Sequence, residues 1–111
     1  MDAKEHSKLV AEAQQEFRRG TIILAVLAGL RQGQHGYPLR KTLADHGLDI
    51  DEGTLYPLLH RLETKGFLEG MWHEENGRKR RFYSLSIRGK AYLDLLVAEW
   101  KTTNKLLEEM V

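Results

Sequence analysis

The chain has 111 residues, enough for one domain with one modest core. Its hydrophobic (41%) and charged (30%) fractions are typical of a soluble globular protein, and no apolar run approaches the ~20 residues of a membrane span. The absence of cysteine excludes a disulfide framework, thiolate catalysis and cysteine-based zinc sites. Because the N-terminus lacks the basic-then-apolar order of a secretory signal, we expect a cytoplasmic protein.

The net charge of +1 hides a gradient along the chain. Residues 18–90 hold 13 Lys and Arg against 8 Asp and Glu, whereas residues 1–17 and 91–111 together hold 4 against 8. A basic middle with acidic ends is typical of a module that contacts phosphates and has arms with another task. The alternative is a chance fluctuation of solvated charge.

The first 30 residues predict two helices separated near Gly20. Residues 3–17 have the periodicity of an amphipathic helix, with Leu9, Val10, Ala13 and Phe17 on one side. Residues 21–30 are apolar nearly all round, which predicts a central buried helix with Thr21 as its N-cap.

The next 35 residues predict a helix-turn-helix. After a turn at residues 32–36, a helix over roughly 38–46 has Pro38 in its first turn, buries Leu39 and Leu43, and exposes Arg40 and Lys41. Gly47 ends this helix. Leu48 and Ile50 are expected to form a very short strand before a second helix over roughly 53–65.

The helix over 53–65 has one apolar stripe, formed by Leu55, Leu58, Leu59 and Leu62. We place Pro57 in its first turn, where the missing N–H costs nothing. Its remaining surface carries hydrogen-bond donors, flat groups and cations, namely Thr54, Tyr56, Pro57, His60, Arg61 and Lys65. Such a helix suits contact with base edges and phosphates in a major groove. An ordinary surface helix is the alternative that periodicity alone leaves open.

A hairpin follows, with strands over 67–75 and 78–85 around Asn76-Gly77, a strong two-residue turn signal. In that register Glu75 faces Arg78 and Glu74 faces Lys79. We expect Arg78 and Lys79 to contact phosphates, and Arg80 and Arg81 to be partly structural. The alternative is a solvated hairpin whose charges pair with one another.

Ser86 is expected to cap a last helix that runs to about residue 109 and is roughly 35 Å long. One side has the 3-4-3-4-3 spacing of a coiled-coil seam, formed by Leu93, Leu96, Trp100, Thr103, Leu107 and Met110. The seam either packs on its own domain or joins two protomers. The helix is too long for so small a domain to cover, which favours a dimer.

The segment Gly53 to Gly66, Gly-Thr-Leu-Tyr-Pro-Leu-Leu-His-Arg-Leu-Glu-Thr-Lys-Gly, resembles the hallmark of the PadR family of bacterial transcriptional regulators. The resemblance implies a mainly α fold with a small β-hairpin, a winged helix-turn-helix flanked by N-terminal and long C-terminal dimerisation helices. The boundaries are then 1–20 for the N-terminal helix, 21–86 for the DNA-binding domain and 87–111 for the C-terminal helix. The expected DNA contacts are Tyr37, Arg40, Lys41, Gly53, Thr54, Tyr56, Pro57, His60, Arg61, Lys65, Arg78, Lys79 and Arg80. The expected dimer contacts are Leu9, Val10, Leu93, Leu96, Trp100, Leu107 and Met110.

The chain is most similar to the short PadR subfamily with a single C-terminal helix, and Trp100 lies where its multidrug-binding members carry a tryptophan. There, paired tryptophans of the dimer sandwich flat, apolar compounds. Carried over, this implies a planar aromatic inducer at Trp100, in a space lined by Val97, Leu93, Ala13 and Phe17. A seam tryptophan that serves only as core is the alternative.

The sequence therefore predicts a homodimeric DNA-binding regulator, a repressor relieved by a small aromatic or lipophilic ligand, which binds a palindromic double-stranded operator. Two rivals are a winged-helix module that binds protein and a dimer that sequesters drugs. We expect no enzyme activity, cofactor or membrane association, since no catalytic motif is present. The five histidines are scattered, so we expect no metal site.

Overall fold

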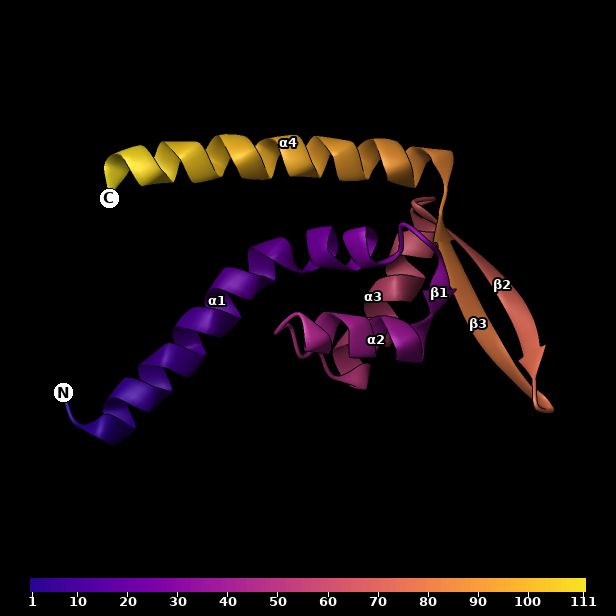
Figure 1. The fold of residues 1–111 in the computed structure, drawn as a ribbon, viewed down its shortest axis with the longest axis horizontal. Coiled ribbons are helices and arrows are strands. Elements are labelled where there is room, and N and C mark those ends of the chain that lie inside the picture. Colours follow the sequence, from indigo (N-terminus) through magenta and orange to yellow (C-terminus); the bar gives the residue numbers. More distant parts are fainter.

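The computed structural model describes residues 1–111, apart from the side chains of His35 and Tyr37. Its elements, in chain order, are α1 (Ala3–Gly29), β1 (Gln34–His35), α2 (Gly36–Asp45), α3 (Glu52–Thr64), β2 (Leu68–Glu75), β3 (Arg78–Leu85) and α4 (Ile87–Met110). The strands form one antiparallel sheet in the order β1-β3-β2. The predicted fold, mainly helical with a hairpin wing, is confirmed. Figure 1 shows the wing at one end of the molecule, and the N-terminus and the end of α4 at the other.

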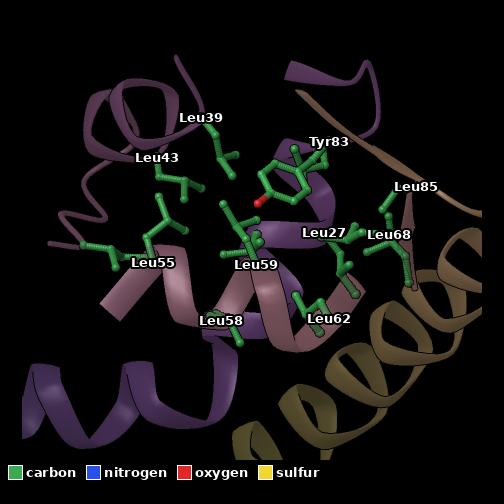
Figure 2. Packing of buried hydrophobic residues seen from close by; sticks show 14 residues of the cluster. Leu27, Leu39, Leu43, Leu55, Leu58, Leu59, Leu62, Leu68, Tyr83 and Leu85 are labelled. Carbon is green, nitrogen blue, oxygen red and sulfur yellow. The ribbon is translucent and has the colours of Figure 1, made fainter. Parts of the chain in front are cut away.

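The core lies where α1, α2, α3 and the sheet meet, and leucines fill most of it (Figure 2). The predicted apolar stripe of α3 is buried, as are Leu39 and Leu43 of α2. Tyr83 of β3 and Leu93 of α4 complete the cluster. Burying a leucine side chain contributes about 1.5–3 kcal/mol. This cluster therefore holds α3 rigidly while its other side stays exposed.

The N-terminal segment is one helix of 27 residues, and the predicted break at Gly20 is wrong. Thr21 is not an N-cap: its hydroxyl donates to the carbonyl oxygens of Phe17 and Arg18, both at 3.4 Å, as mid-helix threonines do. A glycine inside a helix costs only about 1 kcal/mol, too little to end it. The true N-cap is Asp2, whose carboxylate accepts from the Glu5 N–H at 2.7 Å. The helix bends part-way along its length (Figure 1), which threonine back-bonding favours.

The connections around α2 differ in part from prediction. Pro38 lies in the first turn, and Gly47, with φ of +92°, ends the helix region in the left-handed conformation, both as expected. The predicted short strand at Leu48 and Ile50 does not form. Instead, part of the predicted turn at 32–36 is the strand β1, which pairs with Phe82 and Tyr83 along the free edge of β3. That pairing partner is nearly 50 residues away, so no local pattern could indicate it.

Helix α3 begins at Glu52, because Asp51 takes the extended N-cap conformation. Pro57 is therefore its sixth residue and lies in the second turn, so its predicted place in the first turn is wrong. Proline has no N–H to donate to the carbonyl of Gly53. Gly53 is exposed, so water can satisfy that carbonyl.

The hairpin of β2 and β3 has the predicted turn and register. Asn76 and Gly77 both have positive φ, at 52° and 76°, which is the signature of a type I′ turn. The strand β2 begins one residue later than expected, at Leu68. Phe67 instead stacks on Tyr92 of α4, with ring centroids 4.2 Å apart.

Helix α4 begins as predicted, with the Ser86 hydroxyl accepting from the Gly89 N–H at 2.9 Å. Its first turn packs so closely on the wing that a Cβ at Gly89 would lie 1.9 Å from the Phe67 carbonyl oxygen. Its second half is exposed, as is the N-terminal half of α1. Within the described part of the chain, no helix is long and apolar enough to cross a membrane.

Candidate nucleic-acid interface

The outer face of α3 is the first part of the candidate interface. At about 100° per residue, Gly53, Pro57 and His60 point directly away from the buried stripe. Thr54, Arg61 and Lys65 flank them on one side, and Tyr56 flanks them on the other. All of these residues are exposed. The face therefore offers a central strip with one imidazole, a cationic flank and an aromatic flank.

Helix α2 contributes differently from prediction. The Arg40 Nε donates to the Ile50 carbonyl at 2.8 Å, and its guanidinium lies 3.5 Å from Glu52. Only 32% of the Arg40 side chain is exposed, so this residue mainly holds the turn that leads into α3. Lys41 is exposed and pairs with Asp45 at 3.1 Å. Such a surface pair contributes little, so Lys41 stays available to a phosphate. The side chain of Tyr37, a further predicted contact, lies outside the described residues.

Tyr56 joins α3 to the wing. The ring packs against the backbone of Gly36, where a Cβ would lie only 2.4 Å from the ring carbon Cε1. Tyr56 as a whole residue is nevertheless 39% exposed. A groove of about 430 Å³ runs between this ring and the cations of β3, lined by Tyr56, Arg78, Lys79 and Arg80. The structure thus brings the aromatic flank of α3 and the predicted basic arm onto one surface.

The basic arm, Arg78 to Arg80, is exposed along its length. Glu75 and Glu74 face Arg78 and Lys79 in the sheet, as predicted. Among the described side chains, however, no ion pair within 4 Å forms between these strands at the tip of the wing. The side chains of the arm are therefore not held in ion pairs by their own hairpin. Arg81 is different, because it turns toward α3 and pairs with Glu63.

A second concave region lies between α1 and α4. One groove of about 460 Å³ is lined largely by apolar residues, among them Phe17, Leu24, Leu96, Trp100 and Leu107. A neighbouring groove of about 570 Å³ shares Phe17, Leu24 and Trp100 and adds Val97. Trp100 is 51% exposed.

The predicted ligand and dimer residues are only partly brought together. Trp100, Val97 and Phe17 line these grooves, whereas Ala13 is exposed and lines neither. Leu93 is only 2% exposed and packs in the core of its own protomer. Of the remaining predicted dimer contacts, the half-buried Leu96 and the exposed Leu107 line the first groove. Leu9, Val10 and Met110 lie outside both grooves and are 48%, 43% and 74% exposed.

Three residues near the interface were missed by sequence reasoning: Gly36, Glu63 and Gly70. Glu63 belongs to the segment that resembles the PadR hallmark, but nothing local shows its partner. Gly70 interrupts a strand pattern, and a glycine there often marks a close approach of another group. That signal was available in the sequence.

Comparison with known proteins identifies the protein family. The profile of the Transcriptional regulator PadR-like family matches residues 23–95, which run from the last turns of α1 through β1, α2, α3 and the wing to the first turns of α4. The chain belongs to this family. It is 39% identical over 79 residues to the transcriptional regulator Rv3488 of Mycobacterium tuberculosis, covering 70% of this chain and 74% of that protein.

Solved structures of regulators from the same family have the same fold as this chain. A PadR family transcriptional regulator from Eggerthella lenta is 35% identical, with a TM-score of 0.91 over 97% of this chain and 96% of that one. A PadR-like transcriptional regulator from Bacillus cereus is 26% identical, with a TM-score of 0.77 over 86% and 95%. The chain is therefore a winged-helix regulator of transcription that acts by binding DNA, and not an enzyme.

Proposed function

We propose that this PadR-family protein is a homodimeric repressor that places α3 in the major groove of a palindromic operator. The observation that carries the proposal is the shared surface of Tyr56 and the basic arm. With α3 in the groove, the arm faces the neighbouring sugar-phosphate backbone. Phosphate contacts from Arg78 and Lys79 position the helix, and exposed α3 side chains such as His60 and Arg61 contact base edges.

The proposed dimer rests on the exposed apolar residues of α1 and α4. Leu9 and Val10 on α1, and Leu107 and Met110 on α4, are exposed in one protomer. Two protomers that exchange these helices bury both sets at about 1.5–3 kcal/mol for each fully buried side chain. A two-fold axis then requires half-sites about one helical turn, or ~34 Å, apart or a multiple of it.

The proposed inducer is a planar, lipophilic aromatic compound. The two grooves that share Phe17 and Trp100 support this, because a flat ring gains from stacking on an exposed indole. Since both grooves lie between the helices that would form the dimer, an occupant changes the spacing or tilt of the two copies of α3. We expect a repressor of this kind to act in the cytoplasm, where the bacterial chromosome lies.

The test is fluorescence anisotropy with a labelled palindromic duplex from the promoter of the protein's own gene. We expect the logarithm of the binding constant to fall linearly with the logarithm of the salt concentration. We also expect binding to be lost when both half-sites are scrambled. Equal affinity for the scrambled duplex would favour a nonspecific role. No binding to any duplex would favour the rival protein-interaction module. Adding a planar cationic dye should release the DNA, whereas a dye that binds without release would favour a drug-sequestering dimer.

A further inference from the structure

The junction between α3 and the wing contains one ion pair that joins the two halves of the DNA-binding surface. The Arg81 Nη2 of β3 donates to the Glu63 Oε2 of α3. The two side chains are 28% and 25% exposed, so solvent screens the pair less than it screens a surface pair. Of the other ion pairs among the described side chains, two lie within single helices and one joins α2 to the start of α3.

The surrounding residues shape a site for this pair. A Cβ at Gly70 of β2 would lie 2.6 Å from the Glu63 Oε2 and 2.7 Å from the Arg81 Nε. Contacts this short require a shift, so a glycine at this position leaves the space that the pair occupies. Trp72 pairs with Arg81 across the strands, and the guanidinium lies 5.1 Å from the centre of its ring. Cation–π attraction and the carboxylate thus hold Arg81 from two sides.

The neighbouring Tyr83 is largely shielded from solvent at the same junction. Burial raises the pKa of the Tyr83 phenol, the carboxylate of Glu63 raises it further, and Arg81 opposes both effects. Charge-assisted hydrogen bonds are strong and directional in such surroundings. A pair held this way can fix an angle between two elements, which a solvated pair cannot.

We propose that Glu63 and Arg81 are positioning residues for DNA binding, because their ion pair sets the wing against α3. Arg81 directly follows the basic arm, so its anchor determines where Arg78 to Arg80 reach when α3 lies in the groove. The inference rests on the proposed function. Arg81 therefore supports the phosphate contacts of the arm and is not one of them.

The sign of one substitution separates this role from simple electrostatics. Glu63 carries a negative charge beside a surface that binds phosphates. By Coulomb's law alone, Glu63→Gln should strengthen DNA binding. Positioning predicts the opposite: Glu63→Gln should weaken binding to the operator duplex roughly tenfold. Each phosphate contact that the arm loses should lower the slope of log K against log salt by about 0.9.

The matched control is Glu69→Gln, which makes the same charge change on an exposed residue of β2. We expect Glu69→Gln to bind as tightly as the wild type, or slightly more tightly, with an unchanged slope. Anisotropy titrations of the palindromic duplex from the protein's own promoter, at several salt concentrations, measure both quantities. If the wild type fails to bind this duplex, the proposed function fails. If Glu63→Gln binds as well as Glu69→Gln, the positioning role alone is overturned.

A second variant separates positioning from stability. Arg81→Lys keeps the positive charge but loses the planar guanidinium, whose N–H groups fit the geometry of a carboxylate. If the pair acts as a unit, the double variant Glu63→Gln/Arg81→Lys should bind no worse than the weaker single variant. Additive losses would overturn the proposal. So would a loss of affinity at unchanged salt slope that merely follows the fall in melting temperature.

Discussion

Replacing Gly36 by alanine adds one methyl group behind the Tyr56 ring. The new Cβ would lie 2.4 Å from the ring carbon Cε1, 3.2 Å from Cζ and 3.3 Å from Cδ1. Carbon atoms in contact prefer about 3.5–4.0 Å, so the ring must move by about 1 Å or more. Since 39% of the tyrosine is exposed, the ring can swing outward into the groove that it shares with the basic arm.

The effect on DNA binding should exceed the effect on folding. Overpacking costs about 1–3 kcal/mol where the structure cannot yield, and an exposed ring yields more easily than a core side chain. We therefore expect the free energy of unfolding to fall by about 1 kcal/mol. We expect the Tyr56 hydroxyl to donate a hydrogen bond to a backbone phosphate, and a displaced ring would lose this bond, which is worth about 1.5–3 kcal/mol. That loss corresponds to a roughly tenfold or greater weakening per half-site.

Anisotropy titrations and thermal melts of three variants test this reasoning. Tyr56→Phe keeps the ring but removes the hydroxyl, so it should match the DNA-binding loss of Gly36→Ala with little change in melting temperature. Gly20→Ala is the control, because a Cβ there meets nothing within 4 Å. It should leave DNA affinity unchanged. Wild-type affinity in a folded Gly36→Ala protein would refute the role given to Tyr56.

Three further predictions concern other parts of the molecule. Arg61→Ala should cost about 1–3 kcal/mol and relax specificity at one base position, whereas Lys79→Ala should weaken binding to all duplexes and lower the salt slope by about one. Equal loss of specificity in both titration series would contradict these assignments. A chain truncated after Ala98 keeps the buried part of α4 but loses most of the exposed seam, so light scattering should find a folded monomer; a stable dimer would rule out the proposed interface. Trp100→Ala should sharply weaken binding of flat cationic dyes, measured by fluorescence, by about 0.5–1.5 kcal/mol per stacked pair beyond lost burial. Trp72→Ala is its control, and dissociation of Trp100→Ala without any dye binding by the wild type would make this residue simply core.

Truncation after Ala98, and not after Ser86, keeps Leu93 in the chain. The seam pattern alone suggests that all of α4 serves the dimer, and a cut after Ser86 would then test the interface. In the structure Leu93 fills the protomer's own core, and the first turn of α4 packs on Phe67. Removing these residues would unfold the domain. The result would then say nothing about assembly.

The elements that sequence predicts well are those determined by local chemistry. The stripe of α3 follows from leucines at helical spacing, and the wing turn follows from Asn76-Gly77, whose positive φ values few other residues adopt. Elements that depend on distant partners were missed. Gln34–His35 is a strand only because the edge of β3 is free to pair.

The same distinction applies to the binding surface. The exposure of Arg78 and Lys79 follows from a polar hairpin and was predicted, whereas Arg80, which was expected to be partly structural, is exposed as well. The roles of Arg40 and Glu63 depend on partners 10 and 18 residues away, which no local pattern indicates. Arg40 was therefore expected among the DNA contacts, whereas Arg81 was expected to be partly structural and does pair with Glu63. Thr21 shows the converse error, since a good N-cap residue was placed inside a helix that simply continues.

The central claim is that α3 and the basic arm contact one duplex together, twice, around a two-fold axis. Hydroxyl-radical footprinting of the promoter palindrome tests it most directly. We expect two related clusters of protected backbone on one face of the duplex, about one helical turn or a multiple of it apart. In Lys79→Ala, the protection at the outer edge of each cluster should fade while the centre remains. A single cluster, or two clusters that Lys79→Ala leaves unchanged, would contradict the account.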